Sequence, residues 1–486
     1  MISYAYNSFT GCSMRLFEII ILVITFLSFL LRFLPLKKYP WLYLLPTLNL
    51  LAFAYHLFFE GLRWQMIPLY ILAIAFIPMG IRKIMRPERQ FKLGFTILAA
   101  ILMLVGGALP TLLPVPVFPA TTGPYSVGTT SFYWVDEDRL EVYTPDPDLV
   151  YADPPSEPRR VMVQVWYPAT ADQVGEPAPY LPDGVIDAQA LATSFGFPAF
   201  FLNHFQHATT NSLLNAPIAT CFEQWLVLIF SHGWNGMRYQ NIAQMEALAS
   251  HGYIVFAPEH AYGAVVTVYP DGSRIYNKDG ALPSGVSEEE YDAAAYILGQ
   301  SWVGDLVFTL DQVERLQSGD VPSIFQGHLD ITRIGMIGHS TGGGAVLQTC
   351  WQDERCKAVV GEDPWLVPYD RAMPASGLSQ PSLNMFSENW LKEPNQTLVN
   401  QLWDNQPPSA QRMTILGTQH YDFSDISLYS PLGSMLGLKG PISAEREINL
   451  FNDFLVGFFD QHLVNPDSTL LDVAIQEYDE VIFEQK

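Results

Sequence analysis

Long apolar runs dominate the first quarter of the chain and predict membrane-spanning helices. Four runs of about 16 to 21 residues cover 17–36, 41–59, 66–81 and 93–113. About 20 apolar residues in a helix cross the hydrocarbon core of a bilayer, and a cleaved leader peptide does not explain four such runs. The pattern therefore predicts a four-helix transmembrane module over residues 1–119. His56, inside the second run, is expected to form an interhelical hydrogen bond.

The links between these runs differ in charge, and the difference predicts an orientation. The link between the third and fourth runs, 82–92, is strongly basic, and the first link carries Lys37 and Lys38. In the middle link the charges of Glu60 and Arg63 cancel. Because basic loops stay in the cytoplasm, both termini and everything after residue 113 are expected outside. We therefore expect a multi-pass protein of the cell membrane whose large C-terminal part is extracytoplasmic.

Beyond residue 119 the pattern changes to short strands and amphipathic helices. Residues 120–157 contain patches rich in Pro and Gly and are expected to be a linker. Patterns typical of strands cover 160–167, 226–230, 253–258, 331–337, 357–361, 382–386 and 412–416, and helical patterns cover 291–316 and 445–463. Strands that alternate with helices predict a mostly parallel central sheet flanked by helices over residues 158–486.

One predicted strand leads into a glycine-rich turn that carries a serine. The turn reads Gly338-His339-Ser340-Thr341-Gly342, and a small, apolar helical segment follows it. Strand, sharp turn and helix form the setting of a nucleophile elbow, G-x-S-x-G, in which the serine Oγ projects from the end of the sheet. The motif in this context predicts an α/β-hydrolase fold with Ser340 as the nucleophile.

A serine nucleophile needs a base within hydrogen-bond reach and an acid that orients the base. In α/β-hydrolases the order along the chain is Ser, then Asp or Glu, then His. His420 follows the strand 412–416, whereas His462 lies among phenylalanines on the last helix, so His420 is the preferred base. Asp363 follows the strand 357–361 and is the preferred acid, with its neighbour Glu362 as the alternative.

The oxyanion of a tetrahedral intermediate needs two N–H donors. One is expected from Thr341, the residue after the nucleophile. The other is expected from the loop after strand 226–230, and we choose the amide of Trp234. His232 and His339 adjoin these glycine turns and are interpreted as packing or loop-bracing residues.

Charge and cysteine content narrow the possible partners. Residues 1–119 carry a net charge of +7 and the remainder −30, which together give the −23 of the whole chain. Binding to nucleic acid needs a basic face, so it is not expected of the acidic part. Four cysteines do not make a disulfide scaffold. Cys350 and Cys356 are close enough to pair in an oxidising compartment, and two buried thiols are the equal alternative.

No motif indicates a metal or cofactor. The chain lacks H-E-x-x-H, a Cys/His cluster with ligand spacing, and Walker or dinucleotide glycine motifs. Asp422 and Asp425, close to His420, are interpreted as structural residues of the following turn. No metal and no cofactor are therefore expected.

Six motifs occur in combination within residues 158–463. They are VMVQVWYP (161–168), FSHG (230–233), ASHGY (249–253), LDQVE (310–314), RIGMIGHS (333–340) and HYDFSD (420–425). Together they resemble the platelet-activating factor acetylhydrolase family of the plasma (isoform II) type. The resemblance implies an α/β-hydrolase fold, a Ser-Asp-His triad, no metal, and hydrolysis of short or oxidised acyl chains from phospholipids. Bacterial relatives resemble broader carboxylesterases, including polyester-cleaving enzymes.

Two features depart from that family's usual pattern. The four-span module is an addition, and Trp234 stands where a smaller apolar residue is common, so the size of the acyl pocket is open. The leading hypothesis is a membrane-anchored serine ester hydrolase that acts on lipid or small ester substrates. The alternatives are a broad carboxylesterase or polyester hydrolase, a membrane sensor whose hydrolase domain only captures ligand, and a peptidase or acyltransferase on the same fold.

Overall fold

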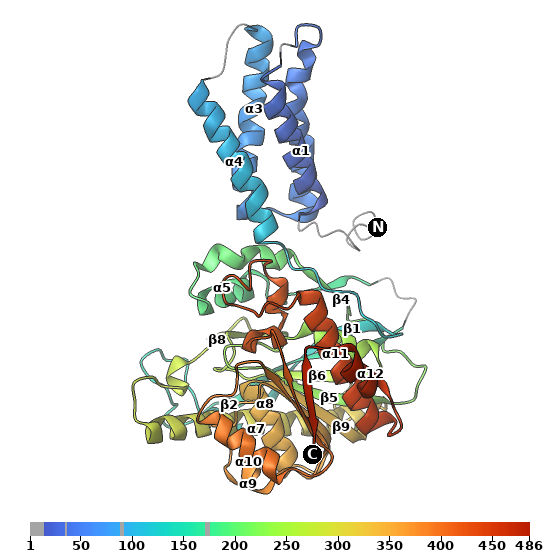
Figure 1. Cartoon of the computed structure of the whole chain (residues 1–486). Helices are drawn as coiled ribbons and strands as arrows, with labels where there is room; N and C mark the ends of the chain where they lie inside the picture. The colour runs from blue at the N-terminus through green and yellow to red at the C-terminus, as the bar shows by residue number, and fades with distance from the viewer. Residues whose placement is uncertain (1–13, 35, 88–91, 171–174) are drawn as a thin grey trace. The chain divides into compact units, whose positions relative to one another are not determined.

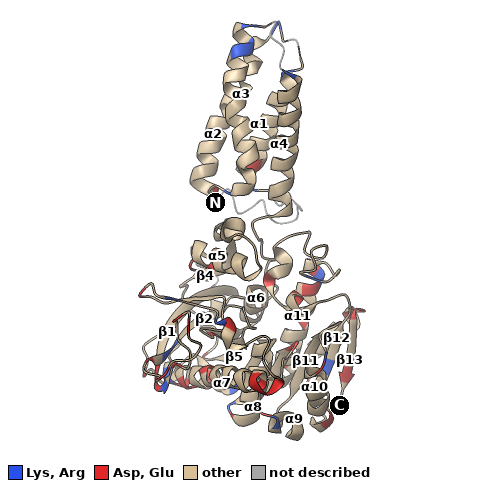
Figure 2. Cartoon of the chain, turned by 90° about the vertical axis from the view of Figure 1, so that its left-hand side faces the viewer, with Lys and Arg blue, Asp and Glu red and all other residues tan. Residues whose placement is uncertain are grey.

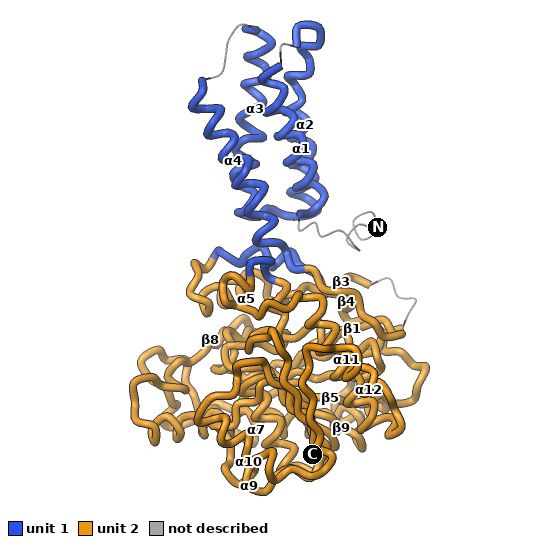
Figure 3. Tube along the Cα trace, in the orientation of Figure 1, with its two compact units in different colours: residues 1–116, 200–208, 429–432 blue, residues 117–199, 209–428, 433–486 orange. Residues whose placement is uncertain are grey.

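The computed structural model describes residues 14–34, 36–87, 92–170 and 175–486 and contains two compact units (Figure 1, Figure 3). The first unit comprises residues 1–116 together with two short segments from later in the chain, 200–208 and 429–432. The second unit comprises residues 117–199, 209–428 and 433–486. The two late segments could not be assigned to the first unit from the sequence, because they interrupt the hydrolase-like pattern without any apolar run of their own.

The first unit is helical. Its elements are the helices α1 (Leu16–Leu31), α2 (Leu48–Tyr55), α3 (Ile67–Met85) and α4 (Leu93–Leu112), the 3-10 segments η1 (Pro40–Thr47) and η3 (Trp64–Met66), and the π-type turn η2 (His56–Glu60). Helix α3 packs against α1, α4 and η1 (Figure 1). The apolar side chains of this unit are largely exposed, which suits a lipid environment better than water.

Three of the four predicted spans are long and apolar enough to cross a membrane. They are Pro40–Glu60, Trp64–Met85 and Leu93–Leu112 among the described residues. The expected span over 17–36 is shorter than predicted, because α1 ends at Leu31, directly before the charged Arg32. Its 16 residues extend about 24 Å at 1.5 Å per residue, less than the hydrocarbon core of about 30 Å. A fourth full span is therefore not established.

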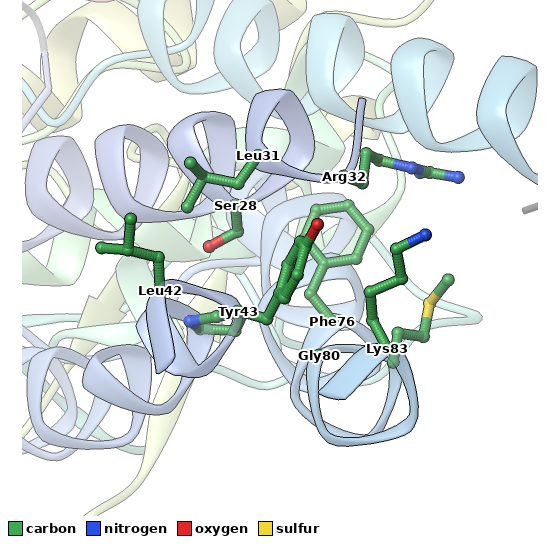
Figure 4. A pocket seen from close by; sticks show the side chains of 10 residues that line it. Ser28, Leu31, Arg32, Leu42, Tyr43, Phe76, Gly80 and Lys83 are labelled. Carbon is green, nitrogen blue, oxygen red and sulfur yellow. The ribbon is translucent and has the colours of Figure 1, made fainter. Parts of the chain in front are cut away.

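The two ends of the helices differ in polarity. Lysine and arginine residues, blue in Figure 2, gather at one end of the helices, and residues 88–91 of the predicted basic link lie outside the described residues. Beside this end, a groove between α1, η1 and α3 is lined by Arg32, Tyr43 and Lys83 (Figure 4). A Cβ atom on Gly80 would lie 1.9 Å from the Tyr43 carbonyl oxygen, so only glycine allows η1 to approach α3 this closely.

The opposite end of the helices holds a buried ionic cluster. Glu18 pairs with Arg63 at 2.5 Å and with Arg15 at 2.7 Å. His56 Nε2 lies 2.5 Å from Tyr70 Oη on α3, which is the kind of interhelical hydrogen bond expected for this histidine. Its Nδ1 also lies 2.8 Å from a Glu60 carboxylate oxygen. Charged groups within such helices persist when they pair with one another.

The second unit is built on a central sheet that contains eleven strands of the described residues, in the order β13-β12-β11-β10-β9-β5-β6-β2-β1-β4-β3. The strands are β1 (Ser126–Leu140), β2 (Pro158–Ala169), β3 (Pro177–Pro179), β4 (Thr209–Leu214), β5 (Trp225–Ser231), β6 (Tyr253–Glu259), β9 (Leu329–His339), β10 (Cys356–Glu362), β11 (Ser382–Ser387), β12 (Ala410–Ile415) and β13 (Val481–Gln485). A separate hairpin pairs β7 (Val266–Val268) with β8 (Arg274–Tyr276).

The middle of the sheet is parallel and its flanks are mixed. Strands β6, β5, β9, β10, β11 and β12 pair in parallel, whereas β2 and β13 join them antiparallel. The prediction of a mostly parallel sheet with flanking helices is confirmed. The linker expected over 120–157 contains β1, because its prolines lie before and after this strand and none interrupts it.

Helices cover both faces of this sheet, since every residue of β6, β11 and most of β10 is buried. Helix α7 packs beside α8, and α6 packs beside α11. The helices are α5 (Val185–Ser194), α6 (Ile242–Ser250), α7 (Glu288–Ser318), α8 (Thr341–Gln352), α9 (Ala372–Ser376), α10 (Asn395–Asn405), α11 (Ala444–Phe459) and α12 (Leu470–Glu477), with shorter turns η4 (Ala199–His207), η5 (Asp279–Ala281), η6 (His420–Phe423), η7 (Asp425–Leu428) and η8 (Asp460–Val464).

Candidate active site

Ser340 occupies a strained turn between β9 and α8. Its backbone dihedral angles are φ +57° and ψ −120°. Residues other than glycine rarely adopt a positive φ, so this conformation is strained. Glycine at position 342 allows the turn to pack against the end of β5, because a Cβ there would lie 2.2 Å from the Ser231 carbonyl oxygen. The turn is held by hydrogen bonds from Ser340 N to Glu362 O (2.8 Å) and from Trp365 N to Ser340 O (2.9 Å). The side chain is thereby fixed at the carboxyl edge of the sheet.

The structure brings Ser340, His420 and Asp363 into one hydrogen-bonded line. His420 Nε2 lies 3.0 Å from Ser340 Oγ, and His420 Nδ1 lies 3.0 Å from Asp363 Oδ2. His420 begins η6 just after β12, and Asp363 directly follows β10. The three side chains follow three parallel strands, β9, β10 and β12, which all end at the same edge of the sheet, with β11 between β10 and β12. The geometry is that of a nucleophile, a base and an orienting acid.

Asp363 is fully buried and held from two sides. Ser387, at the end of β11, donates its N–H to Oδ1 at 2.8 Å and its hydroxyl to Oδ2 at 2.6 Å. Burial raises the pKa of Asp363 to about 7, and the two Ser387 hydrogen bonds act in the opposite direction. Its φ of +43° turns the side chain out of the strand direction toward His420. Ser387 thus fixes the carboxylate that orients the imidazole.

His420 is clamped by aromatic neighbours and remains partly exposed. The Trp390 ring stacks on the imidazole at 3.8 Å between centroids and 4° between planes. His339 Nε2 lies 2.9 Å from the His420 carbonyl oxygen, and Gln240 donates to His339 Nδ1 at 3.0 Å. Burial lowers the pKa of His420 below its usual range, which keeps the imidazole neutral and able to accept a proton.

The loop after β5 passes directly beside the nucleophile. A Cβ on Gly233 would lie 3.2 Å from the Cβ of Ser340, so a side chain at this position would crowd the serine. Thr341 is the first residue of α8, and the N–H of a first helical residue has no acceptor within its own helix. Among the described residues, no backbone acceptor receives the N–H of Trp234. Both predicted oxyanion donors are therefore in segments that adjoin Ser340.

The alternative site residues have other partners. Glu362 is buried and accepts hydrogen bonds from Gln244 (2.9 Å) and Asn241 (3.2 Å), away from His420. His462 lies in η8 against Phe458, with ring centroids 4.7 Å apart. Asp425 accepts the backbone N–H of Ile242 at the start of α6 (2.7 Å) and Asp422 that of Gly440 (2.7 Å). Asp422 and Asp425 therefore brace the segments around η6 and η7, and the side chains of Glu362 and His462 lie outside the line of Ser340, His420 and Asp363.

Sequence reasoning did not identify Ser387 or Trp390. Ser387 ends β11, the parallel strand next to β10. Because parallel strands end at the same edge of a sheet, the sequence could have placed Ser387 close to Asp363. Trp390 lies three residues further along a loop, where neither periodicity nor a motif indicates contact with His420. His339 was expected to brace a loop, and its bond to the His420 carbonyl is such a contact.

Two further features bear on the expected chemistry. Cys350 and Cys356 form a disulfide between the end of α8 and the start of β10, with Cα atoms 5.1 Å apart. Among the described residues, the one group of potential metal ligands is Glu18, His56 and Glu60 in the helical unit. Because Arg63 and Tyr70 already bind Glu18 and His56, we assign no metal to this group.

Comparison with known proteins identifies relatives of the chain. The family model "Platelet-activating factor acetylhydrolase, isoform II" matches residues 114–279 and 307–482. The platelet-activating factor acetylhydrolase of Cavia porcellus is 27% identical over 368 residues, which are 71% of this chain and 78% of that protein. A protein of Arthroderma benhamiae, a probable 1-alkyl-2-acetylglycerophosphocholine esterase, is 26% identical over 53% of this chain and 65% of its own length.

The solved structures point to the same fold. A ferulic acid esterase from Streptomyces cinnamoneus superposes with a TM-score of 0.59 at 24% identity, over 75% of this chain and 98% of that chain. At this identity the similarity supports the fold and not the substrate. The family match covers well over half of the chain and begins at residue 114, after the last apolar helix. The chain therefore belongs to the isoform II platelet-activating factor acetylhydrolase family, a family of carboxylic ester hydrolases.

Proposed function

We propose that this protein is a membrane-anchored serine ester hydrolase that removes short or oxidised acyl chains from phospholipids. The observation that carries the proposal is the line Ser340–His420–Asp363 at the carboxyl edge of a mostly parallel sheet. The family match supports ester hydrolysis, and the names of the relatives in Cavia porcellus and Arthroderma benhamiae suggest an acetylated glycerophospholipid as substrate.

The proposed reaction uses each residue at a defined atom. His420 Nε2 takes the proton of Ser340 Oγ as this oxygen attacks the ester carbonyl carbon. The carbonyl oxygen becomes an oxyanion, which the N–H groups of Trp234 and Thr341 stabilise. The imidazolium, held by Asp363, then protonates the leaving alcohol. Water attacks the acyl-enzyme by the same steps and releases the acid.

The helical unit supports anchoring in a membrane. Three of its helices are long and apolar enough to span a bilayer. We propose that the basic ends of these helices are cytoplasmic and that the hydrolase unit is extracytoplasmic, because basic links stay inside. Reporter fusions after Leu36 and after Ala120 test this orientation, and the proposal requires signals from opposite sides of the membrane.

A broader carboxylesterase is the second candidate. Trp234, in the loop that follows β5 and passes beside Ser340, stands where a smaller apolar residue is common in the family, and this difference would change the acyl group that the site accepts. Both candidates use the same triad, so they differ in the acyl and alcohol groups that the site accepts.

Activity of the full-length chain in detergent or lipid nanodiscs decides between these proposals. We expect hydrolysis of p-nitrophenyl esters that falls with acyl length, and release of the sn-2 acetyl group from an acetylated glycerophosphocholine. Equal rates on bulky aromatic esters and none on the phospholipid would favour the broad carboxylesterase. A folded protein without activity on any ester, or a Ser340→Ala variant as active as wild type, would overturn both.

A further inference from the structure

A second Ser–His–Asp line lies in the interior of the hydrolase unit. His260 Nε2 lies 2.9 Å from Ser231 Oγ, and His260 Nδ1 lies 3.0 Å from Asp305 Oδ2. Ser231 ends β5, His260 follows β6, and Asp305 is in the middle of α7. All three side chains are completely buried, so none of them can meet a substrate. The arrangement of Ser340, His420 and Asp363 therefore recurs at a place that no substrate can reach.

Charge fixes the direction of the hydrogen bonds in this second line. Arg159 and Arg139 each pair with Asp305 at 2.7 Å, and they hold the pKa of this carboxyl well below its usual range. The ionised Asp305 can only accept a hydrogen bond, so His260 donates from Nδ1. Burial keeps His260 neutral, so its Nε2 accepts the hydroxyl proton of Ser231.

The second line connects to the loop beside the nucleophile through His232. The backbone N–H of His260 donates to His232 Nε2 at 3.0 Å, which makes that nitrogen the acceptor. The proton of the neutral imidazole is then on Nδ1, which lies 2.8 Å from the Gly233 carbonyl oxygen and donates to it. The N–H of Gly236 donates to the same carbonyl at 2.9 Å.

Two donors on the Gly233 carbonyl set the direction of the next N–H group. The peptide bond between Gly233 and Trp234 is planar, and in a trans peptide the C=O and the following N–H point in opposite directions. A carbonyl fixed on the side of His232 therefore directs the Trp234 N–H to the other side. The backbone of Gly233 itself passes against the Cβ of Ser340.

We infer that Asp305, His260, Ser231 and His232 form a positioning relay that aims the Trp234 N–H at the oxyanion. The relay touches no substrate. It acts by holding one peptide plane in the orientation that the intermediate needs, before the reaction begins. This inference rests on the proposed function, because it assigns a role in ester hydrolysis at Ser340.

Substitution of His232 tests the relay most directly. His232→Phe keeps an aromatic ring beside Trp302, 5.2 Å away in the wild type, but removes the donor to Gly233. His232→Asn keeps an N–H donor near the Nδ1 position, and His232→Gln places its amide near Nε2 instead. Loss of one oxyanion donor lowers kcat by about 10²–10³, and we expect about 10- to 100-fold for a donor that remains but is misdirected. The phenylalanine and glutamine variants should show this loss with KM little changed, whereas the asparagine variant should stay near wild type.

A pair of substrates separates an effect on the oxyanion from a general loss of structure. In a thionoester, sulfur replaces the carbonyl oxygen and gains little from donors placed for oxygen. We expect the ratio of kcat/KM for an ester to that for its thionoester to fall about tenfold or more in His232→Phe. Ser231→Ala, a milder change at the far end of the relay, should lower this ratio by about fivefold, the effect of one neutral hydrogen bond. Ser212→Ala, which removes another buried hydroxyl (2.5 Å from Glu246), is the matched control and should leave the ratio unchanged.

The outcomes separate the relay from the proposed function. An active wild type, an inactive Ser340→Ala and an unchanged ester-to-thionoester ratio in both His232→Phe and Ser231→Ala would overturn the relay alone. Equal losses on both substrates would also overturn it, since they indicate a purely structural role. A wild type without esterase activity would overturn the proposed function first.

Discussion

The two Ser–His–Asp lines of the hydrolase unit use the same residue types at nearly the same distances, yet they occupy opposite environments. Ser340 sits in a strained turn with φ +57° and keeps some exposure, whereas Ser231 ends an ordinary strand and is completely buried. Each histidine is stacked on a tryptophan, His420 on Trp390 at 3.8 Å and His260 on Trp302 at 4.2 Å. Residue identity and spacing therefore do not distinguish a candidate nucleophile from an internal brace.

The acids of the two lines differ in their counter-charges. Among the described residues no lysine or arginine pairs with Asp363, which is hydrogen-bonded to the neutral His420, and burial raises the pKa of Asp363 to about 7. Asp305 pairs with Arg159 and Arg139, and its pKa is held well below the usual range. Asp363 can therefore stabilise a positive charge that forms on His420. In the second line two arginines already neutralise the acid, and its histidine stays neutral.

The two serines should differ most in activity. Ser340→Ala is expected to lower kcat for ester hydrolysis by about 10⁴-fold or more, because no other nucleophile replaces Oγ. Ser231→Ala should retain activity within about tenfold, since it removes only one buried hydrogen bond. Single-turnover rates on a p-nitrophenyl ester measure both. The reverse order would show that the accessible line is not the catalytic one.

Substitution of the two aspartates should affect different properties, kcat for Asp363 and stability for Asp305. Asp363→Asn is expected to lower kcat by about 10³–10⁴-fold, because the amide cannot hold His420 in the tautomer that accepts the serine proton. Its thermal unfolding should change much less than its rate. Comparison of kcat with the unfolding temperature checks this, and a variant that loses stability while keeping kcat would contradict the assignment.

Asp305→Asn should instead reduce stability. Removing the charge leaves Arg159 with Glu141 as its remaining carboxylate partner. Breaking a buried pair costs up to about 3–5 kcal/mol in the free energy of unfolding, and the partner that remains reduces this loss. The folded-state pKa of Asp305 is depressed, so its contribution is present above the unfolded-state pKa of about 3.9 and is lost as the pH falls through the folded value. Denaturant unfolding near pH 7 and near pH 4 should both show the loss, and wild-type stability in the variant would sink the argument.

The pH dependence of activity should report only the first line. The pair Asp363–His420 must lose one proton before His420 can act as a base, so kcat/KM should rise with pH. The midpoint is expected at or below about 7, the value to which burial raises the pKa of Asp363. Ser231→Ala should leave this midpoint unchanged. A midpoint that moves in Ser231→Ala would mean that the two lines are coupled.

Substitution of the two stacked tryptophans should give the smallest difference in kcat between the two lines. Trp390→Leu is expected to lower kcat by about two- to fivefold, since an aromatic face stabilises a developing imidazolium by about 0.5–1 kcal/mol. Trp302→Leu faces a histidine that remains neutral, so it should affect stability more than kcat. Parallel measurements of kcat and unfolding for the two variants check the difference.

Much of the candidate site was predictable because its signals are local or ordered along the chain. The turn around Ser340 is a contiguous motif, and the fixed order of Ser, acid and His left few candidates after it. Between Asp363 and Glu362 the sequence leaves both open, because neighbouring residues at the end of a strand face different ways. The structure separates them through the φ of +43° at Asp363 and through its bonds to Ser387.

By itself the sequence determined the apolar helices, the mostly parallel sheet and the serine turn, because periodicity and short motifs depend on neighbouring residues. Only the tertiary structure decided that α1 ends too early for a full span, that residues 126–140 form a strand of the central sheet within the expected linker, and that Ser387 and Trp390 contact Asp363 and His420. It alone joined Ser231, His260 and Asp305, which lie on three separate elements. Contacts between distant segments depend on how strands order in the sheet and how side chains pack across it, and no local pattern encodes that arrangement.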